Sequence, residues 1–197
     1  MTPTHDRWIT GVGSRDTPDA VQPLVATLVR ALAARGYGFR SGGARGADTM
    51  FEDAAISVGA DLQVFVTGRR VRRSHHIHLL TMPSTIQQEA AAIAATHHPV
   101  WAELEPWERA LHTRNVPQVL GPTLKSPAKA LVCWAPRSEL DGRGRLRNVG
   151  GGTGQAVRVA YAYGVPSYNL ALPEHVGRLC SLLRIEWPAD FSFQLRQ

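Results

Sequence analysis

Short apolar segments that end at or near glycine alternate with segments of helical periodicity through the first third of the chain. The apolar segments have the length of buried strands. The expected strands are residues 7–13, 37–40 and 62–66, and the expected helices between them are residues 21–35 and 47–58. This order predicts a parallel sheet with right-handed crossovers, in which ligands bind beyond the carboxyl ends of the strands.

The rest of the chain continues the alternation with one interruption. Residues 67–83 are basic and rich in histidine, and residues 137–147 are expected to form a polar loop. Proline at position 117 is expected to kink or end the helix that contains it. The later elements are helices 85–96, 106–120, 150–163 and 174–183 and strands 130–134 and 165–170. We therefore predict an α/β fold: one Rossmann-like α/β/α domain over residues 1–197, three layers with a mostly parallel sheet.

The charge balance favours a polyanionic partner. The 197 residues carry 22 Lys and Arg against 16 Asp and Glu, a formal net charge of +6. Only two cysteines, Cys133 and Cys180, are present, which favours a reducing compartment. The first residues do not resemble a signal peptide and no apolar run is long enough to span a membrane. We expect a cytoplasmic protein without membrane contact.

Three turns share one design for binding phosphate. Each follows an expected strand and precedes a helix, where glycines let the backbone approach a ligand and the helix presents free N–H groups. Serine and threonine hydroxyls and arginine side chains add donors. The candidate binding residues are Gly13, Ser14, Arg15; Ser41, Gly42, Gly43, Ala44, Arg45, Gly46, Asp48; and Gly151, Gly152, Thr153, Gly154, Gln155. The alternative is that these turns serve packing alone.

Several other residues keep two interpretations open. Asp48 either balances the dipole of its helix, accepts a hydrogen bond from a ligand hydroxyl, or orients Arg45. Trp134 either forms the floor of a base pocket or packs in the core, whereas Trp101 and Trp107 are expected in the core or an interface. A basic segment either follows a nucleic-acid backbone or is solvated, and it contains Arg69, Arg70, Arg72 and Arg73. The histidines lack ligand spacing, so no metal site is expected.

The ordered motifs resemble a known family. They are GSR (13–15), SGGARGAD (41–48), RN (Arg114 and Asn115) and GGTGQAVRVA (151–160). Together they resemble the Rossmann-like core of the DNA-processing protein A family (DprA/Smf), within the SLOG superfamily, and short stand-alone members from bacteria and phages. The resemblance implies binding of single-stranded DNA, with Arg15, Ser41, Arg45 and Arg114 on phosphates and Asn115 shaping the pocket. The flanking modules linked to recombinase loading in that family have no counterpart in the sequence.

A second branch of the same superfamily offers an enzymatic alternative. Its phosphoribohydrolases carry the motif GGxGTxxE, whose glutamate supports cleavage of the N-glycosidic bond. Here Gln155 stands in place of the threonine and Arg158 in place of the glutamate. A cation cannot act as the base or stabilise an oxocarbenium-like charge, so cleavage requires another carboxylate, such as Glu89, Glu105 or Glu108.

Two functions follow from the sequence. The first is non-catalytic binding of a nucleotide, a nucleotide-derived signal or single-stranded DNA, with no catalytic residues, no required cofactor and a possible homodimer. The second is a nucleotide-processing N-glycosidase. For the first, replacing Arg15 or Arg45 with alanine is expected to weaken binding, and Gly43→Val is expected to block backbone approach.

Overall fold

The computed structural model describes residues 7–67 and 75–186. Within them, six strands form one sheet in the order β4-β3-β2-β1-β5-β8, and each adjacent pair is parallel. The strands of this sheet are β1 (Trp8–Gly13), β2 (Gly38–Ser41), β3 (Leu62–Val66), β4 (His76–His78), β5 (Ala130–Trp134) and β8 (Ser167–Asn169). The predicted parallel sheet is therefore confirmed.

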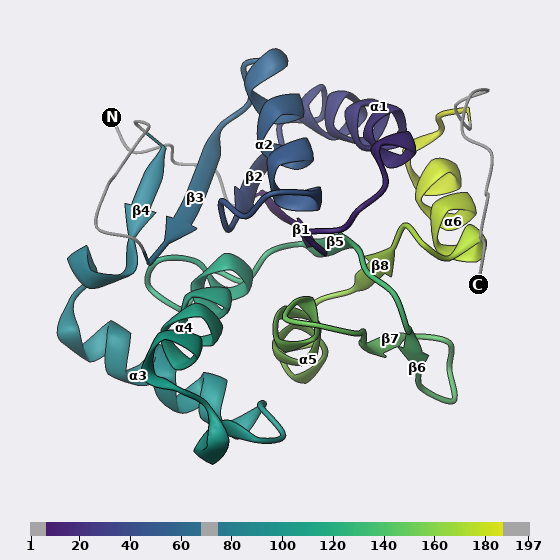
Figure 1. The fold of residues 1–197 in the computed structure, drawn as a ribbon. Coiled ribbons are helices and arrows are strands. Elements are labelled where there is room, and N and C mark those ends of the chain that lie inside the picture. Colours follow the sequence, from purple (N-terminus) through teal and green to yellow (C-terminus); the bar gives the residue numbers. More distant parts are fainter. Residues whose placement is uncertain (1–6, 68–74, 187–197) are drawn as a thin grey trace.

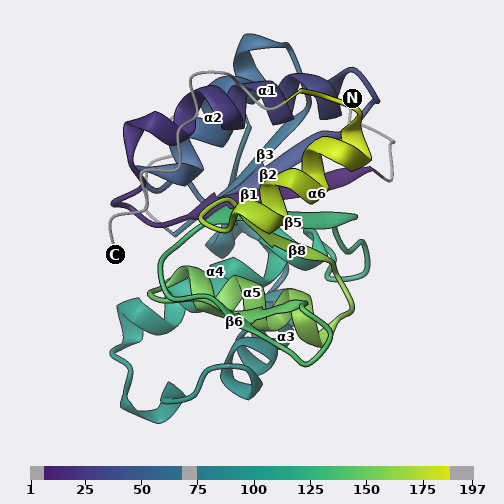
Figure 2. The ribbon, with the colours of Figure 1, turned by 90° about the vertical axis from the view of Figure 1, so that its right-hand side faces the viewer.

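Helices cover both faces of this sheet, which makes three layers (Figures 1 and 2). On one face lie α1 (Gln22–Ala33), α2 (Ala47–Ser57) and α6 (Pro173–Leu183). On the other lie α3 (Ser84–Thr96), α4 (Pro106–Leu120) and α5 (Thr153–Ala162). Short 3-10 helices span Asp19–Val21, Leu79–Thr81 and Trp101–Glu103. The predicted Rossmann-like α/β class is confirmed.

Apolar side chains from the two faces form separate cores. The helix α1 buries Leu24, Val25, Leu28 and Leu32 on one face, at the spacing that brings residues three and four apart together. These side chains join one cluster with β1 and α6, while α4 and α5 pack a second cluster against the opposite face. The sheet is thus buried on both sides, as parallel sheets are.

Two segments differ from the prediction. The edge strand β4 lies in the segment expected to be irregular. The expected polar loop after β5 contains an antiparallel hairpin of β6 (Glu139–Leu140) and β7 (Leu146–Asn148). Its turn is held by Asp141, whose Oδ1 accepts hydrogen bonds from the backbone N–H groups of Arg143 and Arg145. The hairpin is therefore stabilised by hydrogen bonds to a carboxylate within its own turn, not by burial of apolar side chains.

Pro117 does not end its helix. The helix α4 continues three residues beyond it to Leu120, and Gly121 with φ of 80° follows. Proline has no N–H to donate to the carbonyl four residues earlier. Because Pro117 lies in the last turn of the helix, this loss affects only the end of α4. Of the two outcomes expected at Pro117, a kink or an end, the helix end does not occur, and α4 has the bounds predicted from the sequence.

The topology places a crevice at β1. From β1 the chain builds the sheet outward through β2, β3 and β4, and then returns to the other side of β1 with β5. At such a switch point the turns after neighbouring strands separate and leave space for a ligand. None of the helices within the described ranges is long and apolar enough to cross a membrane.

Candidate functional site

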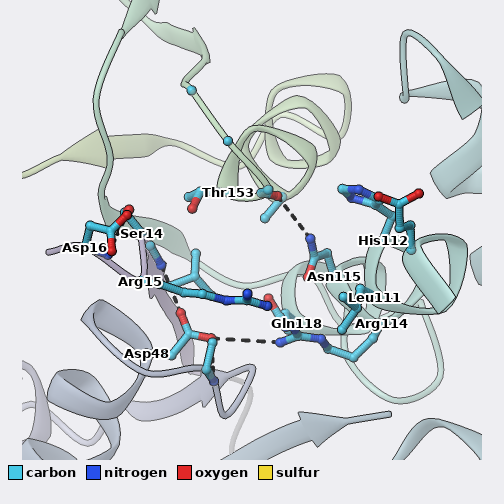
Figure 3. A pocket seen from close by; sticks show the side chains of 18 of the residues that line it. Ser14, Arg15, Asp16, Asp48, Leu111, His112, Arg114, Asn115, Gln118 and Thr153 are labelled. Carbon is cyan, nitrogen blue, oxygen red and sulfur yellow. Dashed lines mark hydrogen bonds and ion pairs between the residues drawn. The ribbon is translucent and has the colours of Figure 1, made fainter. Parts of the chain in front are cut away.

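A cavity of about 480 Å³ opens at the carboxyl ends of β1 and β5 (Figure 3). Its wall is formed by the turns after β1, β2 and β5, one face of α4, and the glycine turn before α5. The lining residues are Val12, Gly13, Ser14, Arg15, Asp16, Ala44, Asp48, Trp107, Glu108, Leu111, His112, Arg114, Asn115, Gln118, Pro136, Arg137, Gly150, Gly151, Gly152, Thr153 and Ala156. The size and position suit a small ligand.

Backbone hydrogen bonds hold the turns after β1 and β2 together. Ser14 donates its N–H to the carbonyl of Trp134 on β5 at 2.8 Å, and Ala47 donates to the carbonyl of Ser14 at 3.2 Å. Gly46 lies between them with φ of 84°, and a Cβ there would come within 2.3 Å of the Ser14 carbonyl. Only glycine permits this approach, so the turn needs its glycine for packing.

The carboxylate of Asp48 occupies the amino end of α2. It is 4% exposed and accepts hydrogen bonds from the N–H groups of Gly13 at 3.0 Å and Ala44 at 3.3 Å. Burial raises the pKa of Asp48, while Arg114 and the backbone donors oppose that rise. The chain's own anion therefore fills the position at which this turn was expected to bind phosphate.

Arg114 on α4 closes the same turn from the other side. Its Nη1 donates to the carbonyl of Gly42 at 2.7 Å and lies 3.8 Å from Asp48 Oδ2. Burial lowers the pKa of Arg114, but a guanidinium keeps its proton in proteins. A Cβ on Gly42 would lie 1.5 Å from Arg114 Nη1 and 2.4 Å from Gln118 Nε2. The glycine at this position makes room for the protein's own side chains.

The turn before α5 is open instead. Gly151, Gly152 and Thr153 line the cavity, and none of their N–H groups has an acceptor among the described residues. Asn115 on α4 donates from Nδ2 to the carbonyl of Gly152 at 3.3 Å and holds the turn in place (Figure 3). The amino end of α5 therefore presents unpaired donors to the cavity.

Two exposed arginines border the cavity. Figure 3 shows the Arg15 side chain reaching across it toward Gln118. The Arg137 guanidinium packs against Gly150, since a Cβ on that glycine would lie 2.9 Å from Arg137 Nε. Across residues 7–67 and 75–186, neither guanidinium has a carboxylate or carbonyl partner. Both charges are available to an anion at the start of α5.

Apolar and aromatic side chains lie at the amino end of α4. Trp107 lines the cavity although its side chain is 64% exposed. Four and five residues later, Leu111 and His112 line the same wall. His112 packs against His98 with 4.3 Å between the ring centroids. Burial, followed by the nearby His98, lowers the pKa of His112 to about 4, so the ring is neutral at pH 7.

The structure brings part of the predicted set together. Predicted residues that line the cavity are Gly13, Ser14, Arg15, Ala44, Asp48, Arg114, Asn115, Gly151, Gly152 and Thr153. Predicted residues that the structure places elsewhere are Ser41, Gly42, Gly43, Arg45, Gly46, Trp134, Gly154 and Gln155. Arg69, Arg70, Arg72 and Arg73 lie outside the described residues.

The excluded residues have identifiable contacts. Ser41 is buried, and its hydroxyl lies 3.4 Å from the Asp48 carbonyl. Arg45 is exposed and pairs with Asp16 at 3.5 Å. A Cβ on Gly43 would face the Val64 and Val66 side chains of β3. Trp134 packs against the core shared by α1 and α6. The turn after β2 therefore faces the protein more than the cavity.

Gln155 and Arg158 are structural. Gln155 is fully buried and donates to the Ala94 carbonyl at 2.9 Å. Arg158 donates to the carbonyl of His97 at 2.7 Å, to Asn148 Oδ1 at 2.7 Å and to Gln155 Oε1 at 3.0 Å. Its guanidinium links α5 to the end of α3 and to β7.

Three carboxylates line the cavity, those of Asp16, Asp48 and Glu108. Among the glutamates considered from the sequence, Glu108 lines the cavity and Glu89 and Glu105 do not. Glu108 accepts from the Glu105 N–H at 2.9 Å in the capping box that starts α4. Within the described part of the chain, no group of three His, Cys, Asp or Glu side chains is placed to hold a metal ion.

Sequence reasoning found Arg114 and Asn115 on α4 but missed the rest of the cavity wall that this helix forms. Trp107, Leu111 and Asn115 recur every four residues, and Glu108 and His112 repeat that spacing. Such a stripe marks one helix face, but its mixed polarity did not distinguish a cavity wall from a solvated face. Arg137 was also missed because it lay in an expected loop.

Comparison with known proteins adds one structural likeness. No protein-family model and no curated protein matches the chain. One solved structure that resembles it is DNA processing protein A from Helicobacter pylori, studied for its mode of binding single-stranded DNA. The two chains are 14% identical, the match covers 92% of this chain and 74% of that one, and the TM-score is 0.49.

Proposed function

We propose that the chain binds a nucleotide in the cavity between α4 and the turn before α5, without cleaving it. The observation that carries the proposal is the set of unpaired donors at the start of α5. The N–H groups of Gly151, Gly152 and Thr153 face a cavity that Arg15 and Arg137 also line. A phosphate there gains backbone hydrogen bonds, the helix dipole and two guanidinium charges.

The amino end of α4 suits a base. Trp107 offers an exposed aromatic face, on which a base stacks regardless of its sequence identity. His112 is neutral and adds a second ring close by. A cavity of about 480 Å³ falls in the size range of small-molecule sites. The cavity thus has donors that suit a phosphate at the start of α5 and aromatic side chains that suit a base at the start of α4.

Carboxylate chemistry supports binding rather than cleavage. Glycosidases use two carboxyl groups, one on each side of the scissile bond. In this cavity Asp48 is bound to backbone donors and Arg114, Glu108 caps α4, and Asp16 pairs with Arg45 at 3.5 Å. Arg158 has three acceptors and lies away from the lining. We therefore propose a binding protein and keep the N-glycosidase as the alternative that product analysis tests.

Isothermal titration calorimetry with matched ligands tests the proposal. The four 5′-nucleoside monophosphates are titrated beside the four nucleosides, which lack only the phosphate. We expect at least one nucleotide to bind with 1:1 stoichiometry and its nucleoside to bind at least a hundredfold more weakly. Equal affinities would remove the phosphate site, and the absence of any binding would remove the proposed function.

A salt series distinguishes a single nucleotide from a polymer. Polymeric nucleic acid releases counterions, so its affinity falls by nearly one logarithmic unit per phosphate contact for each tenfold rise in salt. A deoxyoligonucleotide with that steep dependence, together with mononucleotides that fail to bind, would contradict a single-nucleotide site. Chromatography of the nucleotide after incubation shows whether a free base is released.

A further inference from the structure

Two buried nitrogen atoms at the floor of the cavity lack hydrogen-bond partners. Gln118 is 1% exposed and lines the cavity, and its Nε2 is unpaired. Arg114 Nε, on the same face of α4, is also buried and unpaired within the described residues. A buried polar group without a partner loses its hydrogen bonds to water and gains none, which makes such atoms rare in folded proteins.

A carboxylate acceptor lies beside these donors. Asp48 also lines the cavity, and its Oδ2 lies 3.8 Å from Arg114 Nη1. That separation exceeds a direct hydrogen bond, which has 2.7–3.2 Å between heavy atoms. Asp48 accepts from the N–H groups of Gly13 and Ala44, and the Gly42 N–H is a third backbone donor that lowers its pKa. A carboxylate has about four acceptor positions, so about one is left. The floor thus combines unpaired donors with an acceptor that has remaining capacity.

A phosphate does not fit this combination. Phosphate oxygens only accept hydrogen bonds near neutral pH, so a phosphate beside Asp48 would place two anions together. The Arg114 charge already has two carboxylates near it, Asp48 and, behind the turn after β2, Glu52. A hydroxyl group donates to a carboxylate and accepts from an amide or guanidinium at the same time.

We infer that Asp48, Arg114 and Gln118 bind the hydroxyl groups of a ribose, so that the ligand of this cavity is a ribonucleotide. The inference rests on the proposed function, because the phosphate on α5 brings the sugar of the same nucleotide into the cavity. Two neighbouring hydroxyls can donate to Asp48 and accept from Arg114 and Gln118 at the same time. A deoxyribose lacks one of them and leaves part of the floor unpaired.

The inference holds for either orientation of the Gln118 amide. The amide end lies beside the Arg114 guanidinium, since both approach the Cα of Gly42. With Nε2 facing the cavity, the amide donates to a hydroxyl oxygen. With Oε1 facing it, the amide accepts the hydroxyl proton. A hydroxyl satisfies both arrangements, whereas a phosphate satisfies only the first.

Calorimetry with matched sugars tests this inference on the full chain. The probes are 5′-AMP, its 2′-deoxy and 3′-deoxy analogues, and the same ribose and deoxyribose pairs for the other bases. We expect at least one deoxy analogue to bind about tenfold or more weakly than its ribonucleotide, because buried polar groups lose their partner. A ribo-oligonucleotide as competitor distinguishes a free nucleotide from a residue within RNA.

The variant Gln118→Met connects that preference to the floor. Methionine keeps the length of the side chain and removes the amide. The ribose preference is expected to fall at least threefold, while the free energy of unfolding stays equal or rises, since no hydrogen bond of the Gln118 side chain is lost among the described residues. A large loss of stability together with an unchanged ribose preference would mean a structural role and would overturn the inference.

The outcomes separate the two proposals. Equal binding of ribose and deoxyribose forms would overturn the ribose inference and leave the nucleotide site in place. Binding of neither form would overturn both. An unchanged ribose preference in Gln118→Met would remove Gln118 from the ribose site.

Discussion

The two glycine-rich turns at the amino ends of α2 and α5 are alike in sequence and opposite in structure. In the turn after β2, Asp48 accepts the backbone donors and Arg114 closes the far side. In the turn before α5, the side chain that follows the glycines, Thr153, carries no charge, and the N–H groups remain open. A glycine turn therefore binds an external anion only where the chain supplies none of its own.

The first and largest test of this comparison is Asp48→Ala. Removing the carboxylate deprives the Arg114 guanidinium, whose side chain is 11% exposed, of the buried counter-charge 3.8 Å away. We expect the free energy of unfolding in urea to fall by about 3–5 kcal/mol. Asp16→Ala is the matched control, because Asp16 is exposed and its pair with Arg45 is solvated. Equal effects of the two substitutions would contradict the internal-anion interpretation.

Adding one methyl group to each turn gives the next largest difference. The Cβ of Gly42→Ala would collide with Arg114 Nη1, whereas a Cβ on Gly152 has no atom within 4 Å. We expect Gly42→Ala to lose about 2–3 kcal/mol of stability and Gly152→Ala to change by less than about 1 kcal/mol. Thermal and urea unfolding measure both. Similar losses would show that the turn before α5 is also packed from within.

Ligand affinity sharpens the comparison at the open turn. Arg15→Ala and Arg137→Ala are each expected to weaken nucleotide binding by about 1.5–3 kcal/mol, the scale of a hydrogen bond to a charged group. Arg45→Ala should bind as the wild type does, because Arg45 lies outside the cavity lining. Titration calorimetry gives the three affinities. A loss in Arg45→Ala that matches Arg15→Ala would return the ligand to the turn after β2.

The smallest expected effect concerns pH. Burial, with His98, Arg158 and Arg114 nearby, lowers the pKa of His112 to about 4 while Glu108 opposes the shift. The unfolded chain binds a proton near pH 6.5, so between pH 6.5 and 4 the unfolded state holds more protons than the folded state. Stability therefore falls as the pH falls through this range.

Replacing His112 with glutamine should remove roughly 1–2 kcal/mol of that pH dependence, after allowance for partial exposure. Urea unfolding at pH 4.5 and 7 measures the difference between variant and wild type. Other groups titrate in the same range, so the wild type and the variant are compared at each pH. Parallel pH profiles would show that the His112 pKa is not lowered by folding.

The sequence predicted the regular parts of the fold because apolar periodicity reports burial directly. It predicted five of the six strands in the described sheet and the two helices that connect the first three of them. It did not predict β4, whose three residues lie in a basic segment, or the β6–β7 hairpin, which depends on the side-chain bonds of Asp141. Short polar strands carry little periodic signal.

The candidate site was only partly predictable for a different reason. Both the SGGARGAD and GGTGQ segments combine glycines with a hydroxyl side chain, so local sequence assigns both to phosphate. Only the first contains a carboxylate, Asp48. That this carboxylate turns inward depends on Arg114, which lies 72 residues from Gly42 in the chain and contacts it in space. The distinction between a filled and an open turn is a tertiary property, and spacing within a motif does not contain it.

Arg158 has a consequence for how this scaffold can change. Its guanidinium ties together three oxygen acceptors from different parts of the chain. Exchanging it for glutamate would set a carboxylate against three oxygens that have nothing to donate, so the exchange damages the fold before it introduces any reactivity. A glutamate at this position therefore requires several neighbouring residues to change with it.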